Sequence, residues 1–123
     1  MPEDFIIDNL QGILDSIELI EIRFANIAKP DEFVMNAAGV LTLDSISMRL
    51  QIIGELVKKI DKINPAMWRK YPQIEWPNIM KLRDIISHHY NHVDHEIIYD
   101  VCRNHIPALK QAALQMLKDH TGT

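Results

Sequence analysis

The chain has 123 residues, of which 47% are hydrophobic and 7% aromatic, and its net charge is −4. This length suffices for one domain with a buried core, so we predict a single domain over residues 1–123. No apolar run approaches the roughly 20 residues that span a bilayer, and the acidic start lacks the basic region of a signal peptide. Cys102 is the single cysteine, which excludes a disulfide framework. We therefore expect a cytoplasmic protein without membrane contact, with Cys102 as a small core residue.

The charge is unevenly distributed along the chain. Residues 1–57 contain three basic and ten acidic side chains, whereas residues 58–83 contain seven basic and two acidic ones. The seven basic residues of the second segment are Lys58, Lys59, Lys62, Arg69, Lys70, Lys81 and Arg83. A local positive patch can attract a phosphate chain even on an acidic protein, because screening limits the field of a charge to about 8–10 Å. A solvated helix end would have the same composition.

Two N-terminal segments have apolar residues at alternating steps of three and four, the period of an amphipathic helix. The first helix is predicted over 3–28 and ends at Lys29-Pro30, because the residue before a proline avoids helical backbone angles. A short turn over 31–35 is expected before the second helix, over 42–62. Gly54 lies inside that second helix, where glycine lowers helix propensity by about 1 kcal/mol relative to alanine. We expect it to mark a close helix–helix or subunit contact.

The next segment contains several prolines and aromatic residues. Asn64-Pro65 is typical of the N-cap and first position of a short helical turn. The aromatic residues expected to cover one end of the core are Trp68, Tyr71 and Trp76.

Two helical segments follow. A third main helix is predicted from Pro77, and its expected buried residues are Ile79, Leu82 and Ile86. After a break at 91–93, Asp94 is a good N-cap for a helix over 95–104. Ile106-Pro107 restarts or kinks that helix, which is predicted to end near Lys118. No strand pattern is present, so we predict an all-α antiparallel bundle of four or five helices.

The most informative stretch, residues 83–90, lies on the predicted third helix. An arginine can hold a phosphate through charge-assisted hydrogen bonds, and a histidine titrates near neutrality and can move a proton. Together they are the minimum needed to cleave a phosphodiester. We therefore treat Arg83 and His88 as candidate catalytic residues.

Helix geometry limits how these residues can act together. At about 100° per residue, Asp84 and His88 lie within roughly 40° of each other, and Arg83 and Tyr90 within roughly 20°. Arg83 and His88 diverge by roughly 140° on a regular helix, so one straight helix does not aim both at one atom. Either the helix frays near His88, or a second copy contributes its pair across a two-fold axis. The spacing thus favours a homodimer.

Residues 45–120 resemble the HepT-type family of HEPN domains, the toxin halves of two-gene toxin–antitoxin pairs. The matching pieces, in the family's order, are Arg49–Glu55, Tyr71–Trp76, Arg83-x4-His88-x-Tyr90, Val93-Asp94 and Ile106–Leu109. An arginine and a histidine five residues apart mean little alone, whereas this ordered set is specific. The N-terminal helix matches the family only in its apolar pattern.

The resemblance implies a homodimeric HEPN-type helical bundle that acts as a metal-independent ribonuclease without a cofactor. It implies that Arg83 binds the scissile phosphate of the RNA. His88 would perform acid–base catalysis of attack by the 2′-hydroxyl group, leaving a cyclic phosphate, and Asp84 would orient the site. It also implies a partner, a nucleotidyltransferase antitoxin of the MntA type, which attaches AMP to Tyr90. The added negative charge beside Arg83 would repel an RNA phosphate.

The sequence departs from the family pattern at two places. Many members have asparagine at the position of Asp84, whose carboxylate can pair with His88 or compete with the substrate phosphate for Arg83. Many members also have an aromatic residue and a glycine where Asn91-His92 stand here. His89 is a second candidate for facing the cleft, although the spacing to Tyr90 favours its neighbour.

Two alternatives remain open at this point. Asp84, His88, His92 and His95 would share one face of a continuous helix, as in a metal site, but a break before Asp94 would scatter them. The chain could also be a non-catalytic helical partner, or a nucleotide-binding module, of a nucleotidyltransferase.

Overall fold

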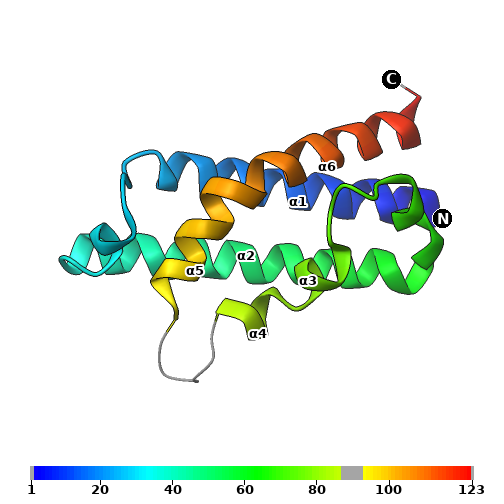
Figure 1. Ribbon diagram of the computed structural model, residues 1–123. Helices are drawn as coiled ribbons and strands as arrows, with labels where there is room; N and C mark the ends of the chain where they lie inside the picture. Colours follow the sequence, from blue (N-terminus) through cyan, green and yellow to red (C-terminus); the bar gives the residue numbers. More distant parts are fainter. Residues whose placement is uncertain (1, 87–92, 123) are drawn as a thin grey trace.

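The computed structural model describes residues 2–86 and 93–122, and Figure 1 shows their arrangement. These residues form helices and connecting turns, with no strand among them. The six α-helices are α1 (Pro2–Phe24), α2 (Ala37–Ile63), α3 (Trp76–Met80), α4 (Leu82–Ile86), α5 (His95–Asp100) and α6 (Ile106–Thr121). The predicted all-α bundle is confirmed. None of these helices is both long enough and apolar enough to cross a membrane.

The core lies between three long helices. α1 packs along α2, and α6 packs on α1 (Figure 1). The apolar stripes predicted for the first two helices face inward: Ile13 and Ile17 of α1, and Leu50 and Ile53 of α2, are almost completely buried. At the surface the Lys110 ammonium group lies 3.0 Å from the Glu21 carboxylate and joins α6 to α1.

α1 ends at Phe24, four residues earlier than predicted. The backbone of Ala28 makes other bonds instead. Its N–H donates to the Glu32 carboxylate at 2.9 Å, and its carbonyl oxygen accepts from the Tyr99 hydroxyl at 2.8 Å. Hydrogen bonds to the Glu32 and Tyr99 side chains therefore replace those that a further helical turn would make at Ala28.

α2 begins at Ala37, before the predicted start at residue 42. The reason is an N-cap that the apolar pattern does not show: the Asn36 side-chain oxygen accepts from the Gly39 N–H at 2.8 Å. The short turn expected before Gly39 is a 3-10 helix, Pro30–Phe33. Its Glu32 carbonyl oxygen lies only 2.2 Å from where a Gly39 Cβ would be, so only glycine fits there.

The aromatic residues cover one end of the core, as predicted. Tyr71 and Trp76 are buried, and the rings of Trp68 and Trp76 stack with centroids 4.3 Å apart. The Trp76 indole N–H donates to the Tyr71 carbonyl oxygen at 2.9 Å, and the Trp68 indole N–H donates to Asp61 at 2.7 Å. These bonds satisfy the polar ends of both rings and hold the 3-10 helix Pro65–Lys70 against the end of α2.

The predicted third helix is divided in two, which corrects the prediction of one continuous helix from Pro77. α3 ends at Met80, and Lys81 has non-helical backbone angles. The Lys81 carbonyl oxygen then accepts from the N–H groups of Asp84 and Ile85, at 2.9 and 3.0 Å, and starts α4. The helix that begins near Pro77 therefore does not continue into the Arg83 stretch, which lies on the separate helix α4.

The last two predicted helices are joined. Residues 101–105 form a π turn, in which the Ile106 N–H bonds to the Val101 carbonyl five residues earlier. Pro107 follows directly, and proline has no N–H to donate and clashes with the carbonyl four residues before it. The wider turn accommodates that clash. α6 then continues to Thr121 and ends at Gly122, whose φ of 74° is the left-handed conformation that glycine readily adopts.

Candidate active site

α4 presents the first two predicted site residues to solvent. Leu82 and Ile86 are 3% and 0% exposed, which fixes the inner face of this short helix in the core. Arg83 and Asp84 lie between them and are both exposed. Neither makes an ion pair with the other or with another described residue. The Arg83 guanidinium group is therefore not neutralised by its neighbour, and both side chains can meet a ligand.

Gly54 positions the start of α4. A Cβ at Gly54 would lie 2.9 Å from the Ile79 carbonyl oxygen and 3.8 Å from the Leu82 Cβ. α2 and the junction of α3 with α4 thus meet backbone to backbone, a contact that a larger residue would prevent. The close helix–helix contact predicted at Gly54 is confirmed, and it lies within the chain. The structure adds Gly54 to the site as a positioning residue.

The far end of α4 is joined to the start of α5. The Ile86 carbonyl oxygen accepts from the Asp94 N–H at 2.8 Å. The Asp94 carboxylate in turn accepts from the N–H groups of Glu96 and Ile97, both at 3.1 Å, which confirms the predicted N-cap. These bonds hold together the two ends of the chain segment that contains the remaining candidate residues.

The remaining candidates are His88 and Tyr90, and both lie outside the described residues, as do His89 and the Asn91-His92 pair. The relation of His88 to Arg83 therefore remains a prediction. The same holds for the metal hypothesis, although Val93 and Asp94 are not helical, so His95 begins a new helix. Among the residues that the structure describes, no group of three metal-ligating side chains is present.

The predicted basic block is a surface feature. All seven of its side chains are exposed, on the last turns of α2, on the 3-10 helix Pro65–Lys70 and at the start of α4. Within the described part of the chain, Lys58 alone among them makes an ion pair, with Glu55 at 3.4 Å. The Lys70 charge also acts on the Asp119 carboxylate and helps to lower its pKa. The other five cations of the block are available to a polyanion.

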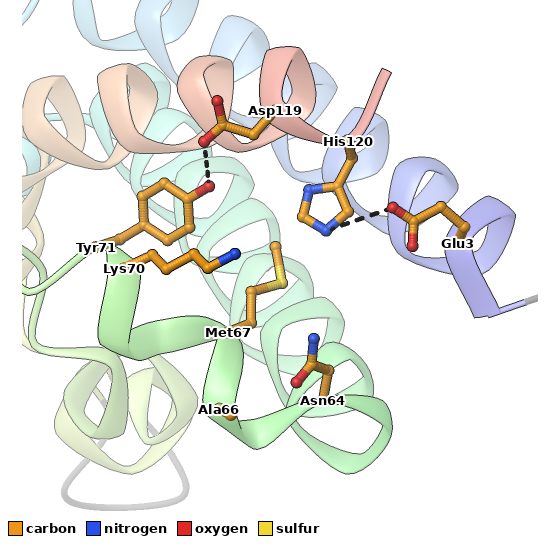
Figure 2. A pocket seen from close by; sticks show the side chains of 8 residues that line it. All are labelled: Glu3, Asn64, Ala66, Met67, Lys70, Tyr71, Asp119 and His120. Carbon is orange, nitrogen blue, oxygen red and sulfur yellow. Dashed lines mark hydrogen bonds and ion pairs between the residues drawn. The ribbon is translucent and has the colours of Figure 1, made fainter. Parts of the chain in front are cut away.

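A cavity of about 370 Å³ lies where the two ends of the chain meet, as Figure 2 shows. The Tyr71 hydroxyl donates to the Asp119 carboxylate, and the His120 ring lies 3.8 Å from the Glu3 carboxylate. Burial and the Asp119 bond raise the pKa of Tyr71 to about 12, and the same bond lowers the pKa of Asp119. Lys70 of the basic block lines this cavity, but none of the predicted site residues does. Because the Tyr71 hydroxyl and the Asp119 carboxylate satisfy each other, we assign the cavity a structural role.

Cys102 is the small core residue that its position on an apolar face predicted. It is 5% exposed, and burial raises the pKa of its thiol to about 12. A thiol of this kind stays protonated and is a poor nucleophile. Cys102 is therefore no candidate for the chemistry, and the Arg83 stretch stays the predicted site.

Comparison with known proteins finds relatives along most of this chain. The family model described as "Ribonuclease HepT-like" matches residues 13–116. A Methanocaldococcus jannaschii protein named "Putative RNase MJ0127" is 34% identical over 99% of this chain and 95% of its own length. A Thermococcus cleftensis protein named "Probable ribonuclease HepT" is 31% identical over 84% of this chain and 87% of its own. No solved structure matched. The chain belongs to the HepT-like ribonuclease family, of the HEPN type.

Proposed function

We propose that this chain is the ribonuclease toxin of a bacterial-type toxin–antitoxin pair. The observation that supports it most is the family match over residues 13–116, which includes the whole stretch from Arg83 to Tyr90. The geometry is compatible with this role, because buried neighbours on α4 hold Arg83 outward, without a described carboxylate partner. The exposed basic block precedes it along the chain and would attract the RNA backbone.

The proposed reaction needs one fixed cation and a group that exchanges protons. Arg83 binds the non-bridging oxygens of the scissile phosphate and stabilises the charge that develops on them. His88 accepts the proton of the 2′-hydroxyl, whose oxygen attacks the phosphorus, and a protonated histidine supplies a proton to the departing 5′-oxygen. The products are a 2′,3′-cyclic phosphate and a 5′-hydroxyl. Asp84 orients the site from the position next to Arg83.

A homodimer would supply the second arginine and the second histidine. On a regular helix Arg83 and His88 diverge by roughly 140°, so an arginine of one subunit would work with a histidine of the other. The outward position of Arg83 on α4 is compatible with an interface there. In this arrangement each subunit alone has an incomplete site.

A nucleotidyltransferase antitoxin would control the activity through Tyr90. The Tyr90 hydroxyl attacks the α-phosphorus of ATP, forms a phosphodiester to AMP and releases pyrophosphate. The attached group adds a negative charge close to Arg83, so it competes with the RNA phosphate for that guanidinium group. The toxin is then silenced without being unfolded.

The direct test is expression of the chain without the nucleotidyltransferase. We expect growth arrest and RNA with cyclic phosphate ends from the wild type, and neither from Arg83→Ala or His88→Ala. Arg103→Ala is a matched control, because Arg103 is also exposed but lies in the π turn outside the basic block. If Arg83→Ala and His88→Ala degrade RNA as well as the wild type does, the enzymatic proposal is wrong and a non-catalytic role is favoured.

The control by AMP has its own test. The intact mass of chain co-expressed with the nucleotidyltransferase of the neighbouring gene should rise by whole AMP units. Tyr90→Phe should abolish the increase, whereas Tyr99→Phe should not, since Tyr99 is engaged with the Ala28 carbonyl. A mass increase that persists in Tyr90→Phe would contradict the assignment of the modified residue.

A further inference from the structure

A groove of about 440 Å³ separates the α3–α4 pair from α5, the π turn and the start of α6. Apolar side chains form its floor, among them Ile79 of α3, Ile85 of α4 and Ile97 of α5. These three are packed against the core on one side, and each is only partly buried. The floor is therefore an apolar strip that the described part of the chain leaves uncovered.

The rim of the groove is acidic. Glu75 and Asp100 stand on opposite sides and are both exposed. Asp100 accepts from the Asn104 amide at 2.7 Å and lies 3.3 Å from the His105 ring. The fourteen described lining residues include no lysine or arginine. This composition contrasts with the basic block on residues 58–83.

These charges determine what kind of molecule the groove fits. An RNA phosphate would meet two carboxylates and no fixed cation, which disfavours nucleic acid. A peptide segment with apolar side chains would cover the floor, and lysine or arginine residues flanking it would pair with Glu75 and Asp100. The complementary partner is therefore a protein segment that is apolar at its centre and basic at its edges.

The walls of the groove adjoin the candidate site. Leu82 and Ile85 of α4 line the groove on one side, and Ile97 and Asp100 of α5 line it on the other. The bond from the Asp94 N–H to the Ile86 carbonyl joins these same two helices at the ends of the segment that contains Tyr90. A protein bound in the groove would thus contact both helices that flank the modified tyrosine.

We propose that this groove is the docking site for the nucleotidyltransferase, which inserts an apolar segment with basic flanks. The proposal rests on the proposed function, because it names the surface through which the antitoxin reaches Tyr90. Docking in the groove places the enzyme beside its target while leaving the exposed face of α4, with Arg83, free for RNA. If docking occurs there, the affinity for the nucleotidyltransferase depends on groove residues that are not among the proposed catalytic residues.

The experiment uses the full chain and the purified nucleotidyltransferase encoded beside it. Ala108→Trp fills the groove from α6, at a lining position that is exposed and so leaves the core intact. Gln111→Trp, also exposed on α6 but outside the lining, is the matched control. We expect Ala108→Trp to weaken binding by about tenfold or more, and Glu75→Gln to weaken it less and reduce its salt dependence. Gln111→Trp should bind as the wild type does.

RNase activity and oligomeric state separate the possible outcomes. Ala108→Trp should retain RNA cleavage, and its mass by light scattering should equal that of the wild type. Unchanged binding by Ala108→Trp would overturn the groove assignment and leave the proposed function standing. Loss of self-association in this variant would also overturn it, because the groove would then contact a second copy. If the wild type neither binds the nucleotidyltransferase nor is modified by it, the proposed pairing fails, and the groove assignment fails with it.

Discussion

Three glycines should respond differently to replacement by alanine, because the structure gives their missing Cβ atoms different neighbours. At Gly54 the nearest atom is the Ile79 carbonyl oxygen, 2.9 Å away on the backbone of α3. At Gly12 the nearest atom is a terminal methyl carbon of Leu56, 3.0 Å away on a flexible side chain. The two distances are nearly equal. A difference in stability between the two alanine variants therefore tests whether the rigid backbone beside Gly54 is what requires glycine there.

The expected magnitudes follow from two opposing effects. Alanine in place of glycine stabilises a helix interior by about 0.5–1 kcal/mol. At Gly54 the Ile79 carbonyl must retreat by about half an ångström to reach an ordinary contact, and such overpacking costs about 1–3 kcal/mol. We therefore expect Gly54→Ala to lower the free energy of unfolding by about 0.5–2 kcal/mol. Gly12→Ala should raise it by up to about 1 kcal/mol, because Leu56 can rotate away.

The assay is urea unfolding followed by circular dichroism at 222 nm. Gly39→Ala completes the series and should be the least stable variant, because its Cβ would lie 2.2 Å from the Glu32 carbonyl oxygen. Gly54→Ala should also reduce RNA cleavage, since the displaced α3–α4 junction adjoins Arg83. A Gly54→Ala protein as stable as Gly12→Ala would refute the close backbone contact.

Three further outcomes follow from the titratable groups. In a phenolate absorbance titration, one of the three tyrosines should ionise only near pH 12, and Tyr71→Phe should remove that component. Because the folded pKa of Tyr71 lies above its ordinary value of 10.0, the stability it contributes should be lost as pH rises beyond that value. The folded pKa of Asp119 is lowered, so its contribution is present above its ordinary pKa of 3.8 and lost as pH falls through the folded pKa. The stability difference between wild type and Tyr71→Phe, measured by urea unfolding, should accordingly shrink from pH 7 to pH 3; a constant difference would contradict the Tyr71–Asp119 bond. Cys102 should react with a disulfide reagent at neutral pH only after unfolding, and rapid reaction of the native protein would show that the thiol is not buried.

The apolar pattern predicted the long helices well because burial of one apolar face is the largest contribution to their stability. It could not predict where α1 ends, since the bonds to Ala28 come from Glu32 and Tyr99, and Tyr99 is 71 residues away in sequence. The division at Lys81 was missed for a related reason. It lies beside the close approach of the Ile79 carbonyl to Gly54, a tertiary contact. The sequence did predict a close contact at Gly54, but it could not predict that the contacting residue is Ile79.

The candidate site was predictable in part. The sequence singled out Arg83 and Asp84 as candidates, and the structure shows both exposed on a helix with a buried inner face, while their roles stay a prediction. The groove beside them was not predictable, because its walls come from α3 and α4 on one side and α5, the π turn and α6 on the other. No single stretch of sequence contains its apolar floor together with its acidic rim. A pattern read along one helix cannot show a surface assembled from several.

The measurement that tests the central claim most directly is a mixing experiment with two inactive variants. Arg83→Ala and His88→Ala proteins are purified separately, combined under conditions that exchange subunits, and assayed for RNA cleavage. If an arginine of one subunit works with a histidine of its partner, half of the dimers are mixed and each has one complete site. Activity should then recover to about a quarter of the wild-type value. Light scattering and mass spectrometry can establish that mixed dimers form. If these mixed dimers are inactive, a site shared between subunits is contradicted.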